Sequence, residues 1–429
     1  MAREMKVSGV EWIGEIPVDW NIKRNKLLFV EVNNRCENGN EHMLLSVSEY
    51  YGVAPKSEKV SDGEFETRAE TLDGYKLCQS EDIVMNIMLA WKRSTGRSAY
   101  DGIVSPAYCV YRKKADIDTK YYHYLFRTDI VAELFKRYST GIIDSRLRLY
   151  PDKFMGLNMI VPPCDEQCQI AEYLDQQCVY IDSVIEKTKV SIDEYIKLKQ
   201  AIITRTVTKG VRGDREMKDS GIECIGQIPS NWDMRKIKYI FKIQKEIAGE
   251  EGHTVLSITQ KGIKPKDLTR NEGQLAENYS NYQLVHMGDF AMNHMDLLTG
   301  WVDISKYEGV TSPDYRVFRL IDKDNYYSKY YLYLMQMCYT NRIFYGLGQG
   351  VSGLGRWRLQ ADKFLNFSIT VPSYEEQEEI ADYLDKKCYA IDDLIAKKEQ
   401  YLSEIENYKK SLIYEYVTGK KEVPQEYQA

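Results

Sequence analysis

The chain carries one motif twice, as VSGVEWIGEIPVDW at residues 7–20 and as DSGIECIGQIPSNW at residues 219–232. A second pair of matching segments runs from Val161 to Asp182 and from Val371 to Asp392. The two pairs have nearly equal separations, 212 and 210 residues. Because unrelated short motifs would not keep such a spacing, the pattern predicts duplication of one whole module, a globular domain followed by a helix. A duplicated module predicts two similar binding surfaces.

Length and composition are those of an ordinary globular protein. The 429 residues are 43% hydrophobic and 28% charged, and no apolar run approaches the ~20 residues that a membrane span needs. The nine cysteines are odd in number and lack a framework spacing, which favours free thiols in a reducing compartment. We therefore expect a cytoplasmic protein with no membrane partner.

The distribution of charge matters more than its sum. A net charge of −6 at first argues against a nucleic-acid partner, because affinity for phosphates comes from lysine and arginine. The excess of carboxylates, however, lies in the two segments 165–209 and 372–421. The rest of the chain is neutral overall and contains local basic clusters, a distribution that is compatible with DNA binding.

The same two segments are expected to be long helices. Neither contains glycine or proline over its seam, and the apolar residues recur at spacings of three, four and seven, which predicts a coiled-coil seam. The seam comprises Ile170, Leu174, Ile181, Ile185, Ile192, Tyr195 and Ile202 in the first segment, and Ile380, Leu384, Ile391, Ile395, Leu402, Ile405 and Leu412 in the second. Ser373 and Glu376 have the spacing of a capping box at the start of the second helix, whereas Pro163 replaces that serine in the first.

The order of the elements predicts how the helices pair. Each helix leaves one globular domain, and the other domain is its only large unpartnered neighbour, so we expect an internal antiparallel pair that brings residues 416–419 close to the N-terminus. The chain would then be pseudo-twofold. Two alternatives stay open: each helix packs on its own domain, or it binds the helix of a partner.

The globular halves are expected to be mixed α+β domains. Short β-branched and aromatic runs, such as 108–111 and 315–318, alternate with turn residues. Between matched ends the copies diverge, as Leu89 to Arg97 in one half and Asp296 to Trp301 in the other. A loop that differs while its scaffold is repeated is typical of a specificity element.

These motifs together resemble the specificity subunit of type I restriction-modification systems. The resemblance covers essentially the full length. It includes the Gly-x-Glu-x-Ile-Gly-x-Ile-Pro-x-x-Trp opening of each half, the Asp-Lys-Phe approach at 152–154 and 362–364, and the Glu-Gln-x-x-Ile-Ala-x-Tyr-Leu-Asp helix starts at Glu166 and Glu376. It implies an α+β fold with two pseudo-twofold-related target-recognition domains, joined by two long antiparallel coiled-coil spacer helices.

The resemblance also implies an organisation and a set of partners. We expect one target-recognition domain at 1–160, a spacer helix at 161–212, the second domain at 213–370, and the second helix with the tail at 371–429. Double-stranded DNA would be read as two halves of a bipartite site, and the helices would dock two methyltransferase subunits, to which a restriction and translocation subunit adds. S-adenosylmethionine and ATP are expected on those partner subunits and no cofactor on this chain.

Candidate DNA contacts follow from the divergent loops and from arginines that both copies keep. Since sequence readers ought to vary between copies, the repeated arginines are better candidates for phosphate contacts. The expected contacts are Ser46, Ser48, Lys92, Arg93 and Arg97 in the first half, Ser257, Thr259, Gln260, Lys261, Asn293 and Asp296 in the second, and the arginine pairs Arg146 with Arg148 and Arg356 with Arg358.

Sequence signals for catalysis are absent. The chain has no Asp/Asn-Pro-Pro-aromatic motif for amino methylation, no Walker lysine and no His-Glu-x-x-His motif. We therefore expect a non-catalytic recognition subunit without a metal site. Two other functions remain open, a fused methyltransferase or nuclease recognition protein, and a coiled-coil scaffold without DNA specificity.

Overall fold

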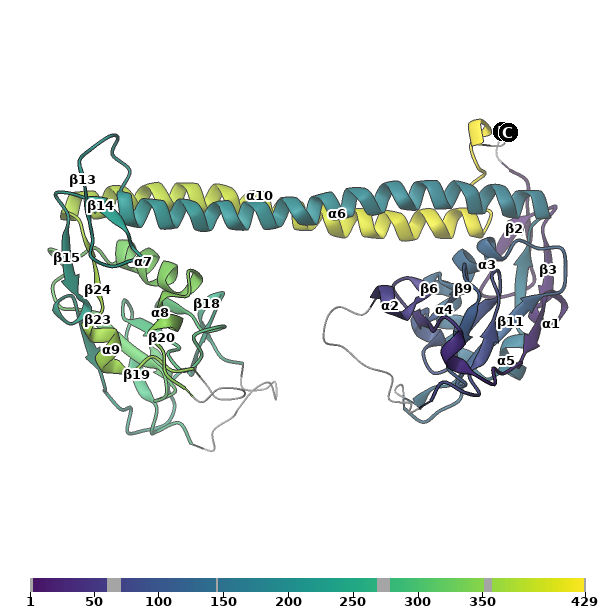
Figure 1. Cartoon of the computed structure of the whole chain (residues 1–429), viewed down its shortest axis with the longest axis horizontal. Coiled ribbons are helices and arrows are strands. Elements are labelled where there is room, and N and C mark those ends of the chain that lie inside the picture. The colour runs from purple at the N-terminus through teal and green to yellow at the C-terminus, as the bar shows by residue number, and fades with distance from the viewer. Residues whose placement is uncertain (1–2, 60–70, 144–145, 268–277, 351–356, 428–429) are drawn as a thin grey trace. The chain divides into compact units, whose positions relative to one another are not determined.

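The computed structural model describes residues 3–59, 71–143, 146–267, 278–350 and 357–427 (Figure 1). Contacts divide the chain into two compact units, Met1–Thr188 with Gln400–Ala429, and Lys189–Glu399. This division cuts both long helices, α6 (Cys164–Lys209) and α10 (Tyr374–Val417), so each unit holds a globular domain and parts of both helices. The boundaries expected from the sequence separate helices from globular parts and stay a prediction.

The globular part of the first unit, called domain 1 here, centres on the antiparallel sheet β4-β11-β8-β9. Aromatic side chains from the helices cover this sheet, with Tyr111 of β11 stacked on Phe154 at 4.4 Å. The strands are β1 (Met5–Val7), β2 (Glu15–Pro17), β3 (Asn21–Arg24), β4 (Phe29–Val32), β5 (Leu45–Ser48), β6 (Gly52–Pro55), β7 (Lys76–Cys78), β8 (Ile83–Asn86), β9 (Thr95–Arg97), β10 (Gly102–Val104), β11 (Tyr108–Lys113) and β12 (Asn158–Val161). The helices are α1 (Asn25–Leu28), α2 (Lys56–Lys59), α3 (Thr119–Phe126), α4 (Asp129–Tyr138) and α5 (Pro151–Gly156), with the short 3-10 turns η1 (Gly39–Glu41) and η2 (Ala90–Lys92).

The globular part of the second unit, domain 2, repeats this plan around the antiparallel sheet β16-β23-β20-β21. Its strands are β13 (Met217–Asp219), β14 (Gln227–Pro229), β15 (Asp233–Lys236), β16 (Phe241–Gln244), β17 (Leu256–Thr259), β18 (Gly262–Pro265), β19 (Gln283–Val285), β20 (Phe290–Met292), β21 (Val302–Ile304), β22 (Gly309–Thr311), β23 (Arg316–Leu320) and β24 (Ser368–Val371). Its helices are α7 (Ser328–Thr340), α8 (Ile343–Gly346) and α9 (Ala361–Asn366), with the 3-10 turn η4 (Ile237–Tyr239). The predicted α+β duplication is confirmed.

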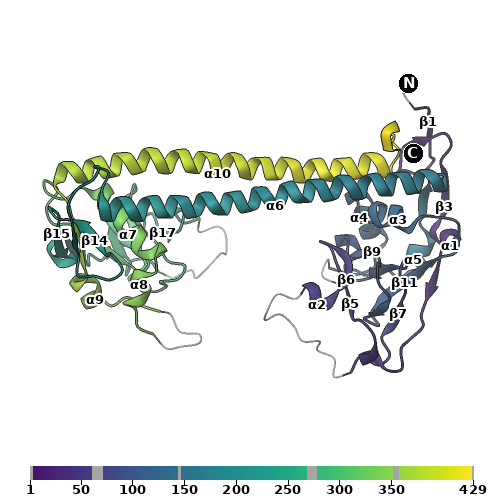
Figure 2. The ribbon, with the colours of Figure 1, turned by 45° about the horizontal axis from the view of Figure 1, so that its top comes forward.

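The two long helices run antiparallel within each unit, as predicted (Figures 1 and 2). In the first unit Lys409 of α10 forms an ion pair with Asp182 of α6 at 2.6 Å, and in the second Lys199 of α6 pairs with Asp392 of α10 at 2.6 Å. Seam residues beside the globular domains, such as Leu174, are fully buried. Those farther along, such as Ile192, are half-buried, because only the partner helix covers them there.

One repeated contact fixes the start of each long helix to its domain. The indole Nε1 of Trp20 donates to the Glu166 carboxylate at 2.7 Å, and that of Trp232 donates to Glu376 at 2.9 Å. An arginine, Arg3 or Arg215, lies over the indole ring in each copy and pairs with the same glutamate. The duplicated opening motif therefore serves to anchor the helix that follows the domain.

This contact corrects one detail of the predicted capping box. The Ser373 hydroxyl accepts the Glu376 backbone N–H at 3.4 Å, as predicted. The Glu376 carboxylate, however, binds Trp232 and forms an ion pair with Arg215 at 2.6 Å. Its side chain therefore faces the domain core, away from the Ser373 backbone N–H that a reciprocal capping box requires.

The C-terminal end of α10 returns to domain 1 within the first unit, also as predicted. The Tyr121 hydroxyl donates to the Val417 carbonyl at 2.7 Å, and Lys420 donates to the Glu15 carbonyl at 3.1 Å. A side chain at Gly419 would meet Pro17 at 2.6 Å, and its φ of +72° also favours glycine. This close approach ends the helix against the first copy of the motif.

Candidate nucleic-acid interface

The structure brings the two predicted contact segments of domain 1 together. The hydroxyl of Ser94, beside Arg93, donates to the Val47 carbonyl of β5 at 3.1 Å. Ser46 and Ser48 lie on β5 and are half-buried; Ser46 shares a hydrogen bond of 2.9 Å with the Tyr51 hydroxyl. The β5–β6 turn and the segment 92–97 therefore form one surface, although about 45 residues separate them in the sequence.

The three cationic side chains of this surface differ in their exposure and in their ion pairs. Lys92 is exposed and its ammonium lies 5.2 Å from the Trp91 ring centre. Arg93 has a left-handed backbone (φ 65°) and pairs with Asp129 at 2.7 Å. Arg97 is mostly buried, with 19% of its side chain exposed, and lies 3.7 Å from the Glu81 carboxylate. Lys92 is thus the most accessible of the three to a phosphate.

Two glycines let the surface strands of domain 1 approach helix α3 closely. A Cβ atom on Gly52 of β6, or on Gly96 of β9, would come 2.9 Å from the His123 ring. The ring accepts the Arg97 backbone N–H at its Nδ1 atom, at 3.2 Å. Burial, together with the nearby Arg127 charge, lowers the pKa of His123 to about 3, so the ring is neutral and can accept this bond.

Domain 2 presents the corresponding surface with different chemistry. Thr259, Gln260 and Lys261 are exposed at the β17–β18 turn, and Ser257 is half-buried on β17. The Gln260 amide donates to the Thr299 carbonyl at 3.3 Å, which joins this turn to the segment 293–300. The structure therefore unites the predicted contact segments of domain 2 as it does those of domain 1.

Two half-buried residues of the segment 293–300 are held by local bonds. The Asn293 side-chain oxygen accepts the Met295 N–H at 3.2 Å. Asp296 accepts the N–H groups of Leu298 and Thr299, each at 3.0 Å, and the Thr299 hydroxyl. Burial opposes the charge of Asp296, but the bonds from Thr299 and Leu298 outweigh it and lower its pKa. An ionised carboxylate here could accept a hydrogen bond from a base amino group.

The repeated arginines occupy equivalent places in the two domains. Arg148 and Arg358 are exposed, and each forms an isolated β-bridge, with Thr140 and Gln349 respectively. Arg146 is exposed as well. Arg356 lies outside the described residues. The matching bridges support the assignment of these arginines to one repeated structural position.

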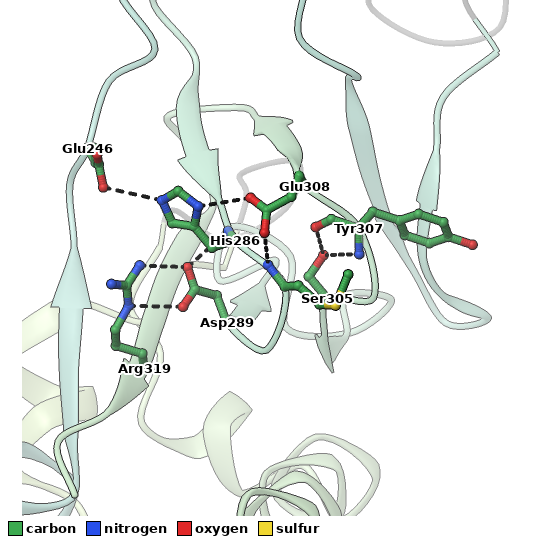
Figure 3. Close-up of polar contacts among 8 residues, drawn as sticks. Glu246, His286, Asp289, Ser305, Tyr307, Glu308 and Arg319 are labelled. Atoms are coloured by element: carbon green, nitrogen blue, oxygen red, sulfur yellow. Dashed lines mark hydrogen bonds and ion pairs between the residues drawn. The ribbon is translucent and has the colours of Figure 1, made fainter. Parts of the chain in front are cut away.

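Sequence reasoning missed a charged cluster on domain 2, shown in Figure 3. The His286 Nδ1 atom lies 2.9 Å from Glu308, and its Nε2 atom lies 3.5 Å from Glu246. The bond to Glu308 is the main cause of a raised pKa for His286, which burial partly opposes. Gln79 occupies the equivalent place in domain 1, so a comparison of the two copies was the one available signal.

Other kinds of site find little support in the described part of the chain. Among those residues, no three His, Cys, Asp or Glu side chains gather closely enough to hold a metal ion. No helix within the described ranges is both long and apolar enough to cross a membrane. All nine cysteines are free, as the sequence predicted.

Comparisons with known proteins agree with this architecture. A family model described as a type I restriction modification DNA specificity domain matches residues 229–407. The type I restriction enzyme MjaVIII specificity subunit of Methanocaldococcus jannaschii is 27% identical over 365 residues, which cover 80% of this chain and 81% of the relative.

Two solved structures share the fold at low sequence identity. A chain from a study of complex assembly and conformational transition of the type I R-M system has a TM-score of 0.68 and 12% identity, covering 94% of this chain and 98% of that one. The HsdS subunit from Thermoanaerobacter tengcongensis has a TM-score of 0.53 and 13% identity, covering 95% and 98%. In its duplicated fold, its family match over residues 229–407 and its relative, the chain is similar to the specificity subunits of type I restriction-modification systems.

Proposed function

We propose that this chain is the DNA-specificity subunit of a type I restriction-modification complex. Each globular domain reads one half of a bipartite site in double-stranded DNA, and the continuous helices α6 and α10 set the spacing of the halves. The observation that carries the proposal is one scaffold, present twice, with different side chains on the same two joined segments. Lys92 and Arg93 of domain 1 stand where domain 2 has Thr299 and Gly300.

This difference predicts two dissimilar half-sites. Cationic side chains favour phosphates and guanine edges, whereas Gln260, Asn293 and Asp296 offer amide and carboxylate groups suited to adenine and cytosine edges. The repeated arginines Arg148 and Arg358 are proposed to contact phosphate in both halves, because a backbone contact carries no sequence information.

The long helices are proposed to dock two methyltransferase subunits. Large apolar side chains are exposed on the helix surface, with Val179 at 71% and Tyr180 at 68% on α6 and Tyr389 at 76% on α10. Val179 and Tyr389 occupy equivalent positions in the two copies. Exposed apolar groups at repeated positions fit one kind of partner bound twice. S-adenosylmethionine and ATP belong to partner subunits in this proposal, and this chain performs recognition alone.

Mapping of methylated bases in the host genome tests the function directly. Cells with this chain should carry one methylated bipartite motif whose two halves differ in sequence, and deletion of its gene should remove that motif alone. An unchanged methylation pattern after deletion would contradict the proposal. A deletion strain that expresses the chain again serves as the control and should regain the motif.

A further inference from the structure

Arg127 follows helix α3 and inserts its guanidinium between the two contact segments of domain 1. The Nη1 group donates to the carbonyls of Ser48, Arg93 and Thr95 at 3.1, 3.0 and 3.0 Å, and Nη2 donates to those of Glu49 and Tyr50 at 2.9 and 3.1 Å. Three of these carbonyls belong to the end of β5 and the β5–β6 turn, and two belong to the segment 92–97. One side chain therefore joins both segments through their backbones.

The charge of Arg127 is directed wholly at the backbone. Among the described residues, no carboxylate lies within ion-pair distance of it, and the acid two residues further along the chain, Asp129, pairs with Arg93 instead. Burial and repulsion from Arg93 lower the pKa of Arg127 to about 10, which leaves it charged at neutral pH. Charge-assisted bonds are stronger than neutral ones, so five carbonyls held by one cation form a stiff junction.

His123, one helical turn before Arg127, supports the same junction. Its neutral ring binds the backbone of Arg97, and Gly52 and Gly96 leave room for the strands to rest on it. Ser94 adds a direct bond from one segment to the other. Backbone positions across this surface are therefore fixed by groups that face the protein interior.

Domain 2 has a weaker junction at this place. Tyr124 and Tyr333 occupy equivalent positions, since each donates to an aspartate of the long helix, at 2.7 and 2.8 Å. By this alignment, the equivalent of Arg127 is Gln336. Its amide donates to the Val302 carbonyl at 3.2 Å, the counterpart of the Arg127 bond to Thr95. A glutamine cannot supply the other four bonds.

We infer that Arg127 is a positioning residue for DNA recognition by domain 1, which holds the β5–β6 turn and the segment 92–97 in one reading geometry. The inference rests on the proposed function. Base readout depends on hydrogen bonds of defined length, so a surface whose two halves can shift separately discriminates poorly between bases. Preorganisation by the half-buried Arg127 cation avoids the cost of ordering these segments on binding. Domain 2 achieves its geometry through Gln260 and other local bonds.

The test is Arg127→Gln, which gives domain 1 the residue of domain 2. The full chain is assembled with its methyltransferase partners, and binding is measured to duplexes in which each base pair of the site is changed in turn. We expect discrimination to fall by about 10-fold or more in one half-site, the half not affected by Gln260→Ala, and to stay within about 2-fold in the other. A purely structural role would lower the affinity for all duplexes of the set by the same factor and leave the discrimination between base pairs unchanged.

Two further variants keep the test decisive. Arg137→Gln removes an exposed arginine of the neighbouring helix α4, paired with Glu11 at 3.0 Å, and should leave both half-sites unchanged. Ser94→Ala deletes one neutral bond across the same junction and should reduce discrimination in the same half as Arg127→Gln, but by less. If Arg127→Gln fails to assemble, Ser94→Ala decides the matter, and unaltered discrimination by it overturns the inference.

The outcomes separate this inference from the proposed function. A wild-type complex that recognises no bipartite site refutes the function whatever Arg127 does. A specific wild-type complex whose Arg127→Gln variant discriminates normally in both halves, or loses both equally, refutes the positioning role alone.

Discussion

Domains 1 and 2 share their attachments to the long helices and differ in the surfaces proposed to read DNA. The indole–glutamate–arginine contact and the tyrosine–aspartate contact recur in both copies. Arg127, in contrast, aligns with Gln336, and His286 aligns with Gln79. The comparison teaches that the duplicated module keeps the contacts that attach each domain to the long helices. The surface segments that these domains carry differ between the copies.

The largest expected effect concerns the glutamate that attaches each domain to its long helix, because Glu166 and Glu376 differ in burial. Glu376 is fully buried, whereas 21% of the Glu166 side chain is exposed. Arg3 also has Asp19 at 3.2 Å as a second partner. We expect Glu376→Ala to cost about 3–5 kcal/mol of unfolding free energy, because it leaves the fully buried Trp232 indole without its acceptor and removes the ion pair of the half-buried Arg215. Glu166→Ala should cost about 1–3 kcal/mol.

Urea unfolding of the two variants measures this difference. Glu379→Ala, which removes an exposed pair with Arg212, is the matched control and should cost no more than about 1 kcal/mol. Equal losses for Glu376→Ala and Glu166→Ala would show that the two anchors are equivalent despite their unequal burial.

The next effect concerns the close packing of strands on His123 in domain 1. Gly96→Ala places a methyl group 2.9 Å from His123, so strand β9 must shift. We expect about 1–3 kcal/mol of destabilisation and reduced recognition of one half-site. Gly156→Ala, at the end of α5, meets no atom within 4 Å and should be tolerated. Calorimetry and binding to the cognate duplex together check both variants, and a stable, fully specific Gly96→Ala protein would contradict the packing argument.

A smaller change is expected when the paired cations of domain 1 are neutralised. Arg93→Gln combined with Arg97→Gln should weaken binding of the assembled complex by only about 10-fold, since each arginine already pairs with a carboxylate of its own domain, Asp129 or Glu81. The slope of log affinity against log salt concentration should fall by up to about 0.9 for each phosphate that the double variant no longer neutralises. Lys261→Gln in domain 2 should affect the opposite half-site. Unchanged affinity of the double variant would remove this loop from the interface.

The smallest effect is a pH dependence peculiar to domain 2. A histidine whose pKa is raised on folding adds stability below its unfolded pKa, about 6.5, and this is lost as the pH rises through the folded pKa. The pKa of Glu308 is lowered, chiefly by the Met287 N–H and then by His286, so its contribution is lost in acid. The contact should therefore be strongest between about pH 4.5 and 6.5.

His286→Gln installs the residue of domain 1 and should remove the decline in stability of the second unit between about pH 6 and 8. Thermal unfolding at several pH values checks this, with Glu308→Gln as a companion variant that should act alike. An unaltered pH profile for both variants would show that the cluster in Figure 3 contributes nothing measurable.

Much of the fold could be predicted from the sequence, because repeats and heptads are local patterns in the chain. The helix expected from Asp165 to Lys209 begins one residue earlier, at Cys164. The partners of the site residues were less predictable, since they depend on tertiary folding. Asp129, on a separate helix, forms the ion pair with Arg93. The Glu376 carboxylate accepts a hydrogen bond from Trp232, 144 residues away in the sequence, and does not complete the capping box.

Arg127 was missed for a related reason. Arg127 binds backbone carbonyls of two segments that are distant in the sequence. Because every residue has a backbone carbonyl, no pattern of residue types reveals which of them will be bound. The difference between Arg127 and Gln336 in the aligned copies was the only signal of this role in the sequence. The DNA contacts themselves stay predictions, because base readout depends on groups that become defined only in a complex.

The central claim is that two copies of one frame read two different sequences independently. The most direct measurement is the affinity of the assembled complex for a complete set of single base-pair changes across its site, made with wild type, Lys92→Ala and Gln260→Ala. We predict that Lys92→Ala alters the preferences in one half-site alone and Gln260→Ala those in the other alone. Changes in both halves from either substitution, or in the same half from both, would contradict the account.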